Sequence, residues 1–368
     1  MSKPTAAARP ASESELMQAL SEPGGAFELV AGGTKRGIGR PVEAAALDLS
    51  ALRGIVDYEP RELVLTARPG TPLQEIQTLL ASEGQRLGFE PPAEIGQTLG
   101  GVLMANRSGS RRLTAGSARD HFIGLRAVNG LGEAFVGGGR VVKNVTGFDL
   151  PKVLAGSWGT LAALTEVTVR VVPMAESEAT LLFAANGPQA AVELCSLALG
   201  SCFDVSAAAF VPARGVALRL EGLASSVQSR IEGLLGSLAH PAQDRLDTET
   251  SRSFWHHIGA VTALAHHPVL WRLSVAPTQA PAILASLDTQ AFQLDWGGGL
   301  IWLGAAAVEA GRIRAALKGG HATLMRAPLE ERRRTRVFEP PGPALAALSA
   351  RLKAAFDPHG RLNPGRMD

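Results

Sequence analysis

Two glycine-rich stretches, about seventy residues apart, constrain this chain more than any other feature of its sequence. The first, residues 31–37, follows the apolar run at residues 27–30, and the second spans residues 98–109. Because glycine has no Cβ, the backbone N–H groups of such stretches can approach a phosphate or a flat ring closely. Either stretch alone would be weak evidence. Together they predict a long ligand that is held at two places, as a dinucleotide is.

The length of 368 residues exceeds one ordinary hydrophobic core and favours two domains. Strand-like and helix-like segments alternate up to Pro173, and the period-two pattern at residues 165–171 predicts a closing strand. Beyond it, strand-like runs between Ala- and Leu-rich helices indicate an α+β domain with a mostly antiparallel sheet; the runs are residues 179–184, 215–221, 270–275 and 299–304. We therefore expect a first domain over residues 1–175, a second over 176–339, and a C-terminal helix and tail over 340–368 that packs back on the first.

Local patterns predict where several helices begin and which faces they bury. Residues 12–15 form a capping box ahead of an apolar face made by Leu16, Met17 and Leu20. Thr71 is the predicted N-cap of a later helix, with Pro72 at its first position. One face of the C-terminal helix is expected to carry Leu345, Leu348, Leu352 and Phe356.

Charge and hydropathy exclude several classes of partner. The net charge of +2 gives no general reason to bind nucleic acid or an anionic membrane. The arginine-rich run at residues 332–336 follows two glutamates, so it is either a solvated face or a docking patch for an acidic partner. No run approaches the length of a membrane span. We expect a cytoplasmic protein, at most peripheral on the inner face of the cell membrane through a partner.

The sequence offers little support for a metal site. Cys195 and Cys202 are too few for an iron–sulfur cluster or a zinc site of their own, and their spacing of seven predicts small core residues on one helix face. The histidine pairs at residues 256–257 and 266–267 have no nearby acidic cluster and are interpreted as packing residues. We expect no metal.

Several motifs together resemble the vanillyl-alcohol-oxidase, or PCMH-type, FAD-binding family. They are the two glycine stretches, the strand at residues 166–171 and the turn at residues 362–365. The resemblance implies an α+β fold in which a flavin domain of two subdomains holds FAD between them, with an α+β cap domain. Within the family, the chain is similar to the E subunit of bacterial glycolate oxidases in segments spread over nearly its whole length: residues 119–126, 138–149, 320–326 and 363–367.

The resemblance also implies which residues bind the cofactor. The first pyrophosphate loop would be Gly32, Gly33, Thr34, Lys35, Arg36 and Gly37. The loop that wraps the phosphates and reaches the flavin would be Thr98, Leu99, Gly100, Gly101, Ala105, Asn106 and Gly109. Beside the ribityl chain and ring would lie Gly116 and Asp120, and at the adenine end Glu166 and Val167. The first loop contains no histidine, so FAD would be bound non-covalently.

Elementary chemistry agrees with a pyrophosphate site. Glycine-rich turns, and a helix N-terminus expected near Gly101, supply converging N–H donors. Asn106 would either donate to a phosphate or flavin oxygen or cap the turn before it. A Rossmann fold is excluded because no Gly-x-Gly-x-x-Gly joins a first strand to a helix with an acidic residue about twenty positions on.

Departures from the family pattern limit the catalytic assignment. The chain lacks the His-x-Gly-Asp-Gly-Asn motif of family members that oxidise 2-hydroxy acids, and its single tyrosine, Tyr58, lies away from the glycine stretches and is expected to be structural. His321 and Arg326 are the weak candidates for a base and a carboxylate clamp, and a turn with a strand-end arginine explains them equally well. Lys143 and Asn144 would position the flavin or a partner, or only close a turn.

The resemblance implies an FAD-binding subunit of a glycolate oxidase complex. A D-type flavin subunit would oxidise glycolate to glyoxylate, and an iron–sulfur F-type subunit would carry the electrons onward. Two alternatives stay open: a self-sufficient FAD-dependent oxidoreductase acting on a small 2-hydroxy acid, and a flavin-free assembly scaffold.

Overall fold

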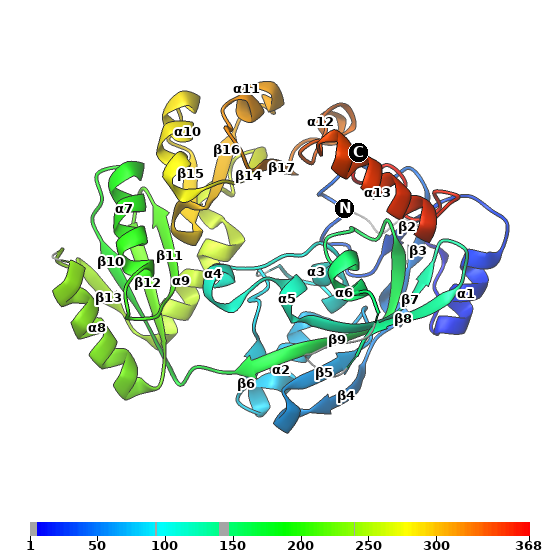
Figure 1. The fold of residues 1–368 in the computed structure, drawn as a ribbon, viewed down its shortest axis with the longest axis horizontal. Helices are drawn as coiled ribbons and strands as arrows, with labels where there is room; N and C mark the ends of the chain where they lie inside the picture. The colour runs from blue at the N-terminus through cyan, green and yellow to red at the C-terminus, as the bar shows by residue number, and fades with distance from the viewer. Residues whose placement is uncertain (1–5, 93, 140–146, 239) are drawn as a thin grey trace. The chain divides into compact units, whose positions relative to one another are not determined.

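The computed structural model describes residues 6–92, 94–139, 147–238 and 240–368. The chain divides into two compact units, and each consists of segments that are separate in sequence (Figure 1). The first unit comprises Met1–Ser108, Gly116–Met174 and Pro340–Asp368. The second comprises Gly109–Ala115 and Ala175–Glu339.

A small parallel sheet opens the first unit. Its strand order is β1 (Ala6–Ala8), β3 (Ala45–Asp48) and β2 (Phe27–Val30). Helix α1 (Glu13–Ser21) buries Leu16 and Leu20 in the same cluster as Leu47. The predicted cap is present, because Ser12 Oγ accepts from Glu15 N, but the Glu15 carboxylate accepts from Ala11 N instead of closing the box on Ser12.

A larger antiparallel sheet forms the rest of the first unit's framework. Its order is β4 (Ile55–Glu59), β5 (Val64–Ala67), β9 (Ala162–Pro173), β7 (Phe122–Asn129) and β8 (Ala134–Gly138), with β6 (Gln85–Leu87) paired to β9. The predicted alternation in β9 is confirmed, since Val167, Val169 and Val171 are all buried in one core. Apolar residues of three helices pack against this core: α2 (Leu73–Ser82), α3 (Leu99–Met104) and α6 (Leu150–Leu154).

The predicted start of α2 is wrong by one position. Pro72 is the N-cap, and Thr71 lies before it. The Thr71 hydroxyl donates to the carbonyl oxygen of Arg68 at 2.7 Å and accepts from Gly54 N at 2.9 Å. Thr71 therefore stabilises the preceding turn instead of capping the helix.

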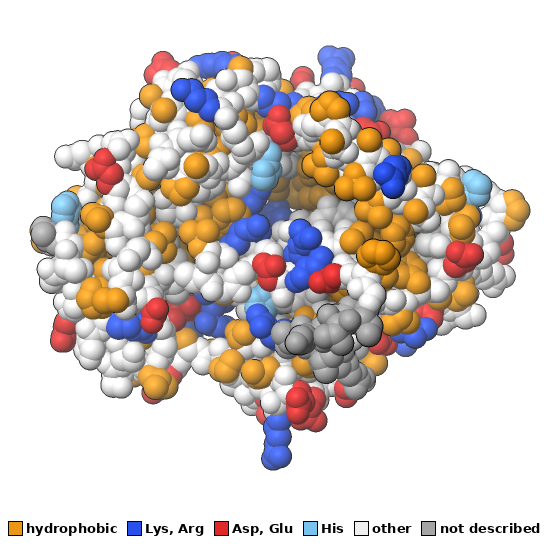
Figure 2. Space-filling model, viewed as in Figure 1, with side chains coloured by type: hydrophobic (Ala, Val, Ile, Leu, Met, Phe, Trp, Pro, Cys, Tyr) orange, Lys and Arg blue, Asp and Glu red, His pale blue; other side chains and the backbone are white. Residues whose placement is uncertain are grey.

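The C-terminal segment returns to the first unit. In α13 (Pro343–Phe356), Phe356 packs edge-on against Phe135 at 5.5 Å between ring centroids. Only half of the predicted apolar stripe is covered, because Leu345 and Leu348 are 58% and 56% exposed. Hydrophobic side chains are correspondingly visible over α13 in the space-filling view (Figure 2). Beyond the helix, Leu362 is fully buried and forms a parallel bridge with Phe27 of β2.

The second unit is built on one eight-stranded sheet whose recorded pairs are all antiparallel, as predicted. Its order is β13 (Asp244–Leu246), β10 (Ser177–Phe183), β12 (Gly215–Gly222), β11 (Val205–Val211), β15 (Phe292–Asp295), β16 (Leu300–Ala305), β14 (Val269–Ser274) and β17 (His321–Arg326). The four predicted runs correspond to β10, β12, β14 and β16.

Helices cover both faces of this sheet. On one face, the core includes residues of α7 (Pro188–Leu199), α8 (Ala224–Leu238), α10 (Ala280–Leu287) and α11 (Ala310–Ala315). On the other, Trp255 and Ile258 of α9 (Thr248–Ala260) pack on alternate residues of β11 and β12. Cys195 is buried in α7, but Cys202 lies beyond the end of α7 and is exposed, so the prediction of a shared buried face is wrong.

The remaining described helices are short. They are α4 (Arg112–Ala115), α5 (Ala118–His121) and α12 (Leu329–Arg334). In the part of the chain that the structure describes, no helix combines the length and hydropathy needed to cross a bilayer.

Candidate functional site

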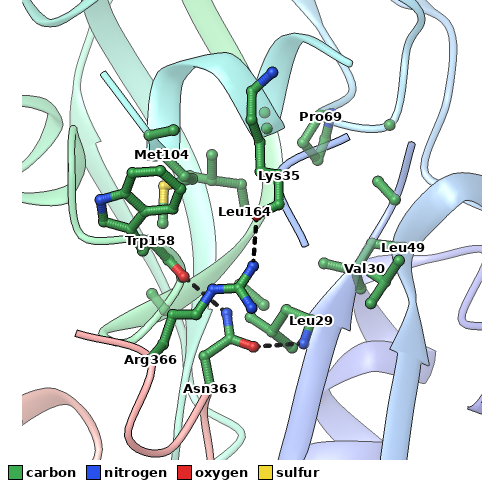
Figure 3. Close-up of a pocket in the computed structure, with 18 residues that line it drawn as sticks. Leu29, Val30, Lys35, Leu49, Pro69, Met104, Trp158, Leu164, Asn363 and Arg366 are labelled. Atoms are coloured by element: carbon green, nitrogen blue, oxygen red, sulfur yellow. Dashed lines mark hydrogen bonds between the residues drawn. The ribbon is translucent and has the colours of Figure 1, made fainter. Parts of the chain in front are cut away.

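A cavity of about 110 Å³ lies within the first unit, where the end of β2, the start of β9 and helix α3 meet. Its wall is mainly apolar, from side chains such as Leu29, Met104 and Leu164, and small residues of α3 and β9 complete it (Figure 3). Lys35, Asn363 and Arg366 are the polar side chains with their functional groups at this wall. A cavity of this size accommodates one part of a dinucleotide, so the remainder of such a ligand would extend beyond it.

The loop after β2 provides the donors that a phosphate needs. Within the described residues, no acceptor is found for the backbone N–H groups of Gly32, Gly33, Thr34 and Lys35. Gly33 has a φ of 75°, a left-handed conformation that glycine adopts without strain. A Cβ at Gly32 would collide with the carbonyl oxygen of Gly96 and lie 3.3 Å from the Thr98 methyl carbon, so this loop closely approaches the start of the second glycine-rich segment. Consecutive unengaged N–H groups in a turn form an anion-binding concavity.

Lys35 adds positive charge beside these donors. Its ammonium group pairs with the carboxylate of Glu94 and lies 3.3 Å from the carboxamide oxygen of Gln97. Arg107 also pairs with Glu94, at 3.3 Å. Burial lowers the pKa of Lys35, and the positive charge of Arg107 adds to this shift while Glu94 opposes it. Two cations share one carboxylate, and the excess positive charge suits an anionic ligand.

The Arg36 side chain stabilises the loop and is not among the residues that line the cavity. Its guanidinium makes two hydrogen bonds to the Glu28 carboxylate, at 2.7 and 3.0 Å, and this pairing raises the pKa of Arg36. Arg366 also approaches Glu28, at 3.7 Å. The structure therefore uses Arg36 to fix the loop against β2.

The N-terminus of α3 does not supply the expected free donors. The helix begins at Leu99, two residues before Gly101. The N–H of Leu99 donates to Thr71 O, that of Gly100 donates to Pro69 O at 2.8 Å, and that of Gly101 donates to the Thr98 hydroxyl at 3.3 Å. These first-turn amides are therefore satisfied within the protein. Gly100 is needed for packing, because its Cβ would lie 2.6 Å from Pro69 Cβ. What α3 offers to the cavity is the small surface of Gly100, Gly101 and Ala105.

Asn106 and Asp120 hold the chain that follows α3. The Asn106 side-chain oxygen accepts from Arg119 N at 3.0 Å, and Asn106 itself has a φ of 47°. The Asp120 carboxylate accepts from both the N–H and the hydroxyl of Ser117, at 2.8 and 2.7 Å. Gly116 has a φ of 89°, and a Cβ there would lie 3.2 Å from Asp120 Cβ. These residues shape the segment without lining the cavity.

Three other predicted positions lie elsewhere. Gly109 belongs to the second unit, where its carbonyl oxygen accepts from the indole nitrogen of Trp296. Glu166 and Val167 lie on β9 beyond Leu164, the last β9 residue at the cavity. Val167 is fully buried in the core, so only its backbone could reach a ligand.

Among the polar cavity residues, sequence reasoning missed Asn363 and Arg366. The Asn363 side chain links the backbones of two cavity-lining segments. Its Oδ1 accepts from Leu29 N and its Nδ2 donates to Trp158 O, both at 2.8 Å (Figure 3). Arg366 donates to the backbone oxygen of Lys35 at 2.9 Å. The turn at residues 362–365 was the available signal, since an apolar, turn-rich terminus packs on the body.

The candidate base and clamp are on β17 of the second unit. In the sheet register, His321 is opposite Ser274 and Arg326 is opposite Leu270, four residues apart on β14, or about 13 Å. Arg326 donates to Leu264 O at 2.7 Å. Burial lowers the pKa of His321, with Arg272 and Arg112 adding to the shift and Glu339 opposing it.

Of the remaining sequence candidates, Tyr58 has a structural role. His256, His257 and His266 are exposed, so the interpretation of the histidine pairs as packing residues is wrong for these three. Tyr58 donates to Gln85 Oε1 at 3.0 Å. The rings of His256 and His257 are 5.9 Å apart and those of His266 and His267 4.1 Å apart, and no group of three or more metal-ligating side chains occurs in the described ranges. Lys143 and Asn144 fall outside those ranges.

Comparison with known proteins identifies the family to which this fold belongs. A family model described as an FAD binding domain matches residues 4–137. A crystal structure of alkyldihydroxyacetonephosphate synthase has the same fold, with a TM-score of 0.67 at 14% identity, covering 97% of this chain and 76% of the other. The fold and the glycine-lined site thus define a PCMH-type FAD-dependent oxidoreductase subunit, with FAD as its cofactor.

Relatives in sequence define the family more narrowly. The chain is 36% identical to glycolate oxidase subunit GlcE of Escherichia coli over 346 residues, which cover 91% of this chain and 90% of that protein. It belongs to the GlcE family. It is also 33% identical to glycolate oxidase subunit GlcD of Bacillus subtilis over 159 residues, 43% of this chain and 32% of that protein.

Proposed function

We propose that this chain is the FAD-binding E-type subunit of a glycolate oxidase complex, with a D-type flavin subunit and an iron–sulfur F-type subunit as its partners. The observation that carries the proposal is the similarity to GlcE along 91% of the chain, which includes both units. Bound FAD would supply a group that accepts a hydride and passes on electrons.

The residues of the first unit fit the cofactor. The amides of Gly32 to Lys35 and the Lys35 ammonium would hold the pyrophosphate. The apolar cavity beside Trp158 and Met104 would exclude water from a flat ring. We infer non-covalent attachment, because residues 32–37 contain no histidine.

We assign oxidation of the hydroxy acid to the D-type partner. The sequence lacks the His-x-Gly-Asp-Gly-Asn motif, which supports this assignment. Electrons would pass through the iron–sulfur partner. We place the complex in the cytoplasm, and the net charge of +2 supports attachment to the inner face of the membrane through the partners instead of through this chain.

The visible absorption spectrum of the purified chain tests the proposal, recorded before and after anaerobic addition of glycolate. A yellow protein that glycolate bleaches only when the D-type subunit is present is the expected result. Bleaching of the isolated chain would instead establish a self-sufficient oxidoreductase. A colourless chain that takes up no FAD would establish an assembly scaffold.

A further inference from the structure

A second cavity, of about 560 Å³, lies within the second unit. It is bordered by α9, by the turn between β11 and β12, and by the 3-10 helix η3 (Thr262–Leu264). Its volume falls in the range of about 300–1,000 Å³ that is typical of small-molecule sites. Neither the flavin assignment nor the family similarity gives this cavity a role.

The floor of the cavity is apolar. Val211 and Ile258 are buried there and belong to the cluster that includes Trp255, and the partly buried aromatic side chain of Phe254 also lines the cavity. Burying an apolar group against such a surface is favourable by roughly 25 cal/mol per Å². The floor therefore suits a ligand with an aromatic or branched aliphatic body.

One buried polar side chain lies in this apolar surface. Gln293 is 1% exposed, and its Nε2 donates to the carbonyl oxygen of Ile258 at 2.9 Å. Among the described residues, no donor reaches the Gln293 carboxamide oxygen. A buried amide that uses one of its groups for the fold can orient a ligand with the other.

The rim of the cavity is cationic. Arg214 lies at its edge, on the turn between β11 and β12, and no carboxylate pairs with its guanidinium in the described part of the chain. His257 donates through Nδ1 to Ser253 O at 2.7 Å, which leaves its Nε2 for another partner. No aspartate or glutamate is among the lining residues. An unpaired guanidinium with five fixed donors favours a carboxylate.

We propose that this cavity binds a small organic acid, whose carboxylate pairs with Arg214 and whose aromatic or branched aliphatic body packs on Phe254, Ile258 and Val211. The charge at the rim of the cavity and the apolar floor set the orientation of the bound acid. The proposal does not depend on the flavin role of the first unit.

Isothermal titration calorimetry on the full-length chain tests this with defined probes. Phenylacetate and 4-methylpentanoate are expected to bind with dissociation constants below about 1 mM. Phenylacetamide, which keeps the ring but lacks the charge, and glycolate, which keeps the carboxylate but lacks the body, should each bind at least about tenfold more weakly. Failure of both acids to bind, or equal binding of all four probes, would overturn the proposal.

Variants locate the binding. Arg214→Ala is expected to weaken phenylacetate binding at least about tenfold, because it removes the proposed charge partner from an exposed position. Ala263→Trp should abolish binding by filling the cavity. Arg245→Ala removes an exposed arginine of β13 that does not line the cavity, so its affinity should match the wild type. Equal affinities for Arg214→Ala and Arg245→Ala, with unchanged melting temperatures, would reject this cavity as the site.

Discussion

The indole nitrogen of Trp296 donates a hydrogen bond of 3.1 Å to the carbonyl oxygen of Gly109. The neighbouring Ser110 hydroxyl donates to the Asp295 carboxylate at 2.7 Å, so Gly109 and Ser110 are anchored by Trp296 and by Asp295, the last residue of β15. The segment Gly109–Ala115 thus belongs to the second unit, although the chain on either side of it belongs to the first. Gly109, expected to bind the cofactor, thus stabilises the sheet of the second unit.

Loss of the Trp296 hydrogen bond should therefore weaken the second unit. Trp296→Phe keeps an aromatic ring but removes this donor from the Gly109 carbonyl oxygen, which still accepts from Arg112 N, so the expected cost is about 0.5–1.5 kcal/mol. Trp302→Phe is the matched control, because Trp302 is also buried and no acceptor for its indole nitrogen is found among the described residues. Urea denaturation measures the difference, and equal losses in the two variants would contradict the anchoring role.

Gly32→Ala should remove bound flavin. A Cβ at this position would collide with the Gly96 carbonyl oxygen and push the phosphate loop away from the second segment. Gly37→Ala is the control, since nothing lies within 4 Å of its would-be Cβ. We expect the ratio of flavin to protein absorbance to fall at least about tenfold for Gly32→Ala and to stay near the wild-type value for Gly37→Ala.

Lys35→Gln should weaken FAD binding by about 1.5–3 kcal/mol, because it removes the cation next to the free amides. Titration of the apoprotein with FAD at two salt concentrations measures this loss. The affinity of the variant should also depend less on salt than that of the wild type. Lys152→Gln, on α6 and away from the cavity, should bind FAD normally. An unchanged affinity for Lys35→Gln would place the pyrophosphate elsewhere.

Asn363 should be essential to the shape of the cavity. Asn363→Gly tolerates the left-handed φ of 43° but loses both hydrogen bonds, so we expect a loss of about 2–4 kcal/mol in unfolding free energy and weaker flavin retention. Asn363→Ala adds backbone strain and should be less stable than Asn363→Gly. Thermal unfolding of the holoprotein ranks the two variants; the reverse order would show that backbone strain is not important at this position.

Cys195 should make stability depend on alkaline pH. Burial, aided by the negative charge of Asp295, raises the pKa of the Cys195 thiol to about 12, from an ordinary value of 9.0. Between these two pKa values the native state keeps the thiol proton that the unfolded chain loses. The contribution of Cys195 to the unfolding free energy is therefore complete below pH 9 and falls by about 1.4 kcal/mol per pH unit above pH 9. The difference in unfolding free energy between wild type and Cys195→Ala should shrink from pH 9 to pH 11.

Local sequence patterns predicted the elements well where one residue type dominates the conformation. The valines of β9, the Ser12 cap and the four strand runs of the second unit are all found in the structure. Predictions failed where a distant residue changes the local outcome. Thr71 bonds to Gly54 and Arg68 instead of capping α2, and Leu345 and Leu348 stay exposed because little of the first unit lies against that end of α13.

The two glycine-rich segments could be recognised in the sequence, because glycine and small residues allow the backbone to approach a ligand closely, and the family and cofactor followed from the resemblance that these segments carry. Which backbone amides are available to a ligand depends on the folded structure. Those of Leu99, Gly100 and Gly101 are satisfied by Thr71, Pro69 and Thr98, whereas those of Gly32 to Lys35 are not engaged within the described residues. It also brought Asn363 and Arg366 to the cavity from the far end of the chain. The physical reason is that hydrogen-bond satisfaction depends on partners that folding brings together, and these partners lie far apart in sequence.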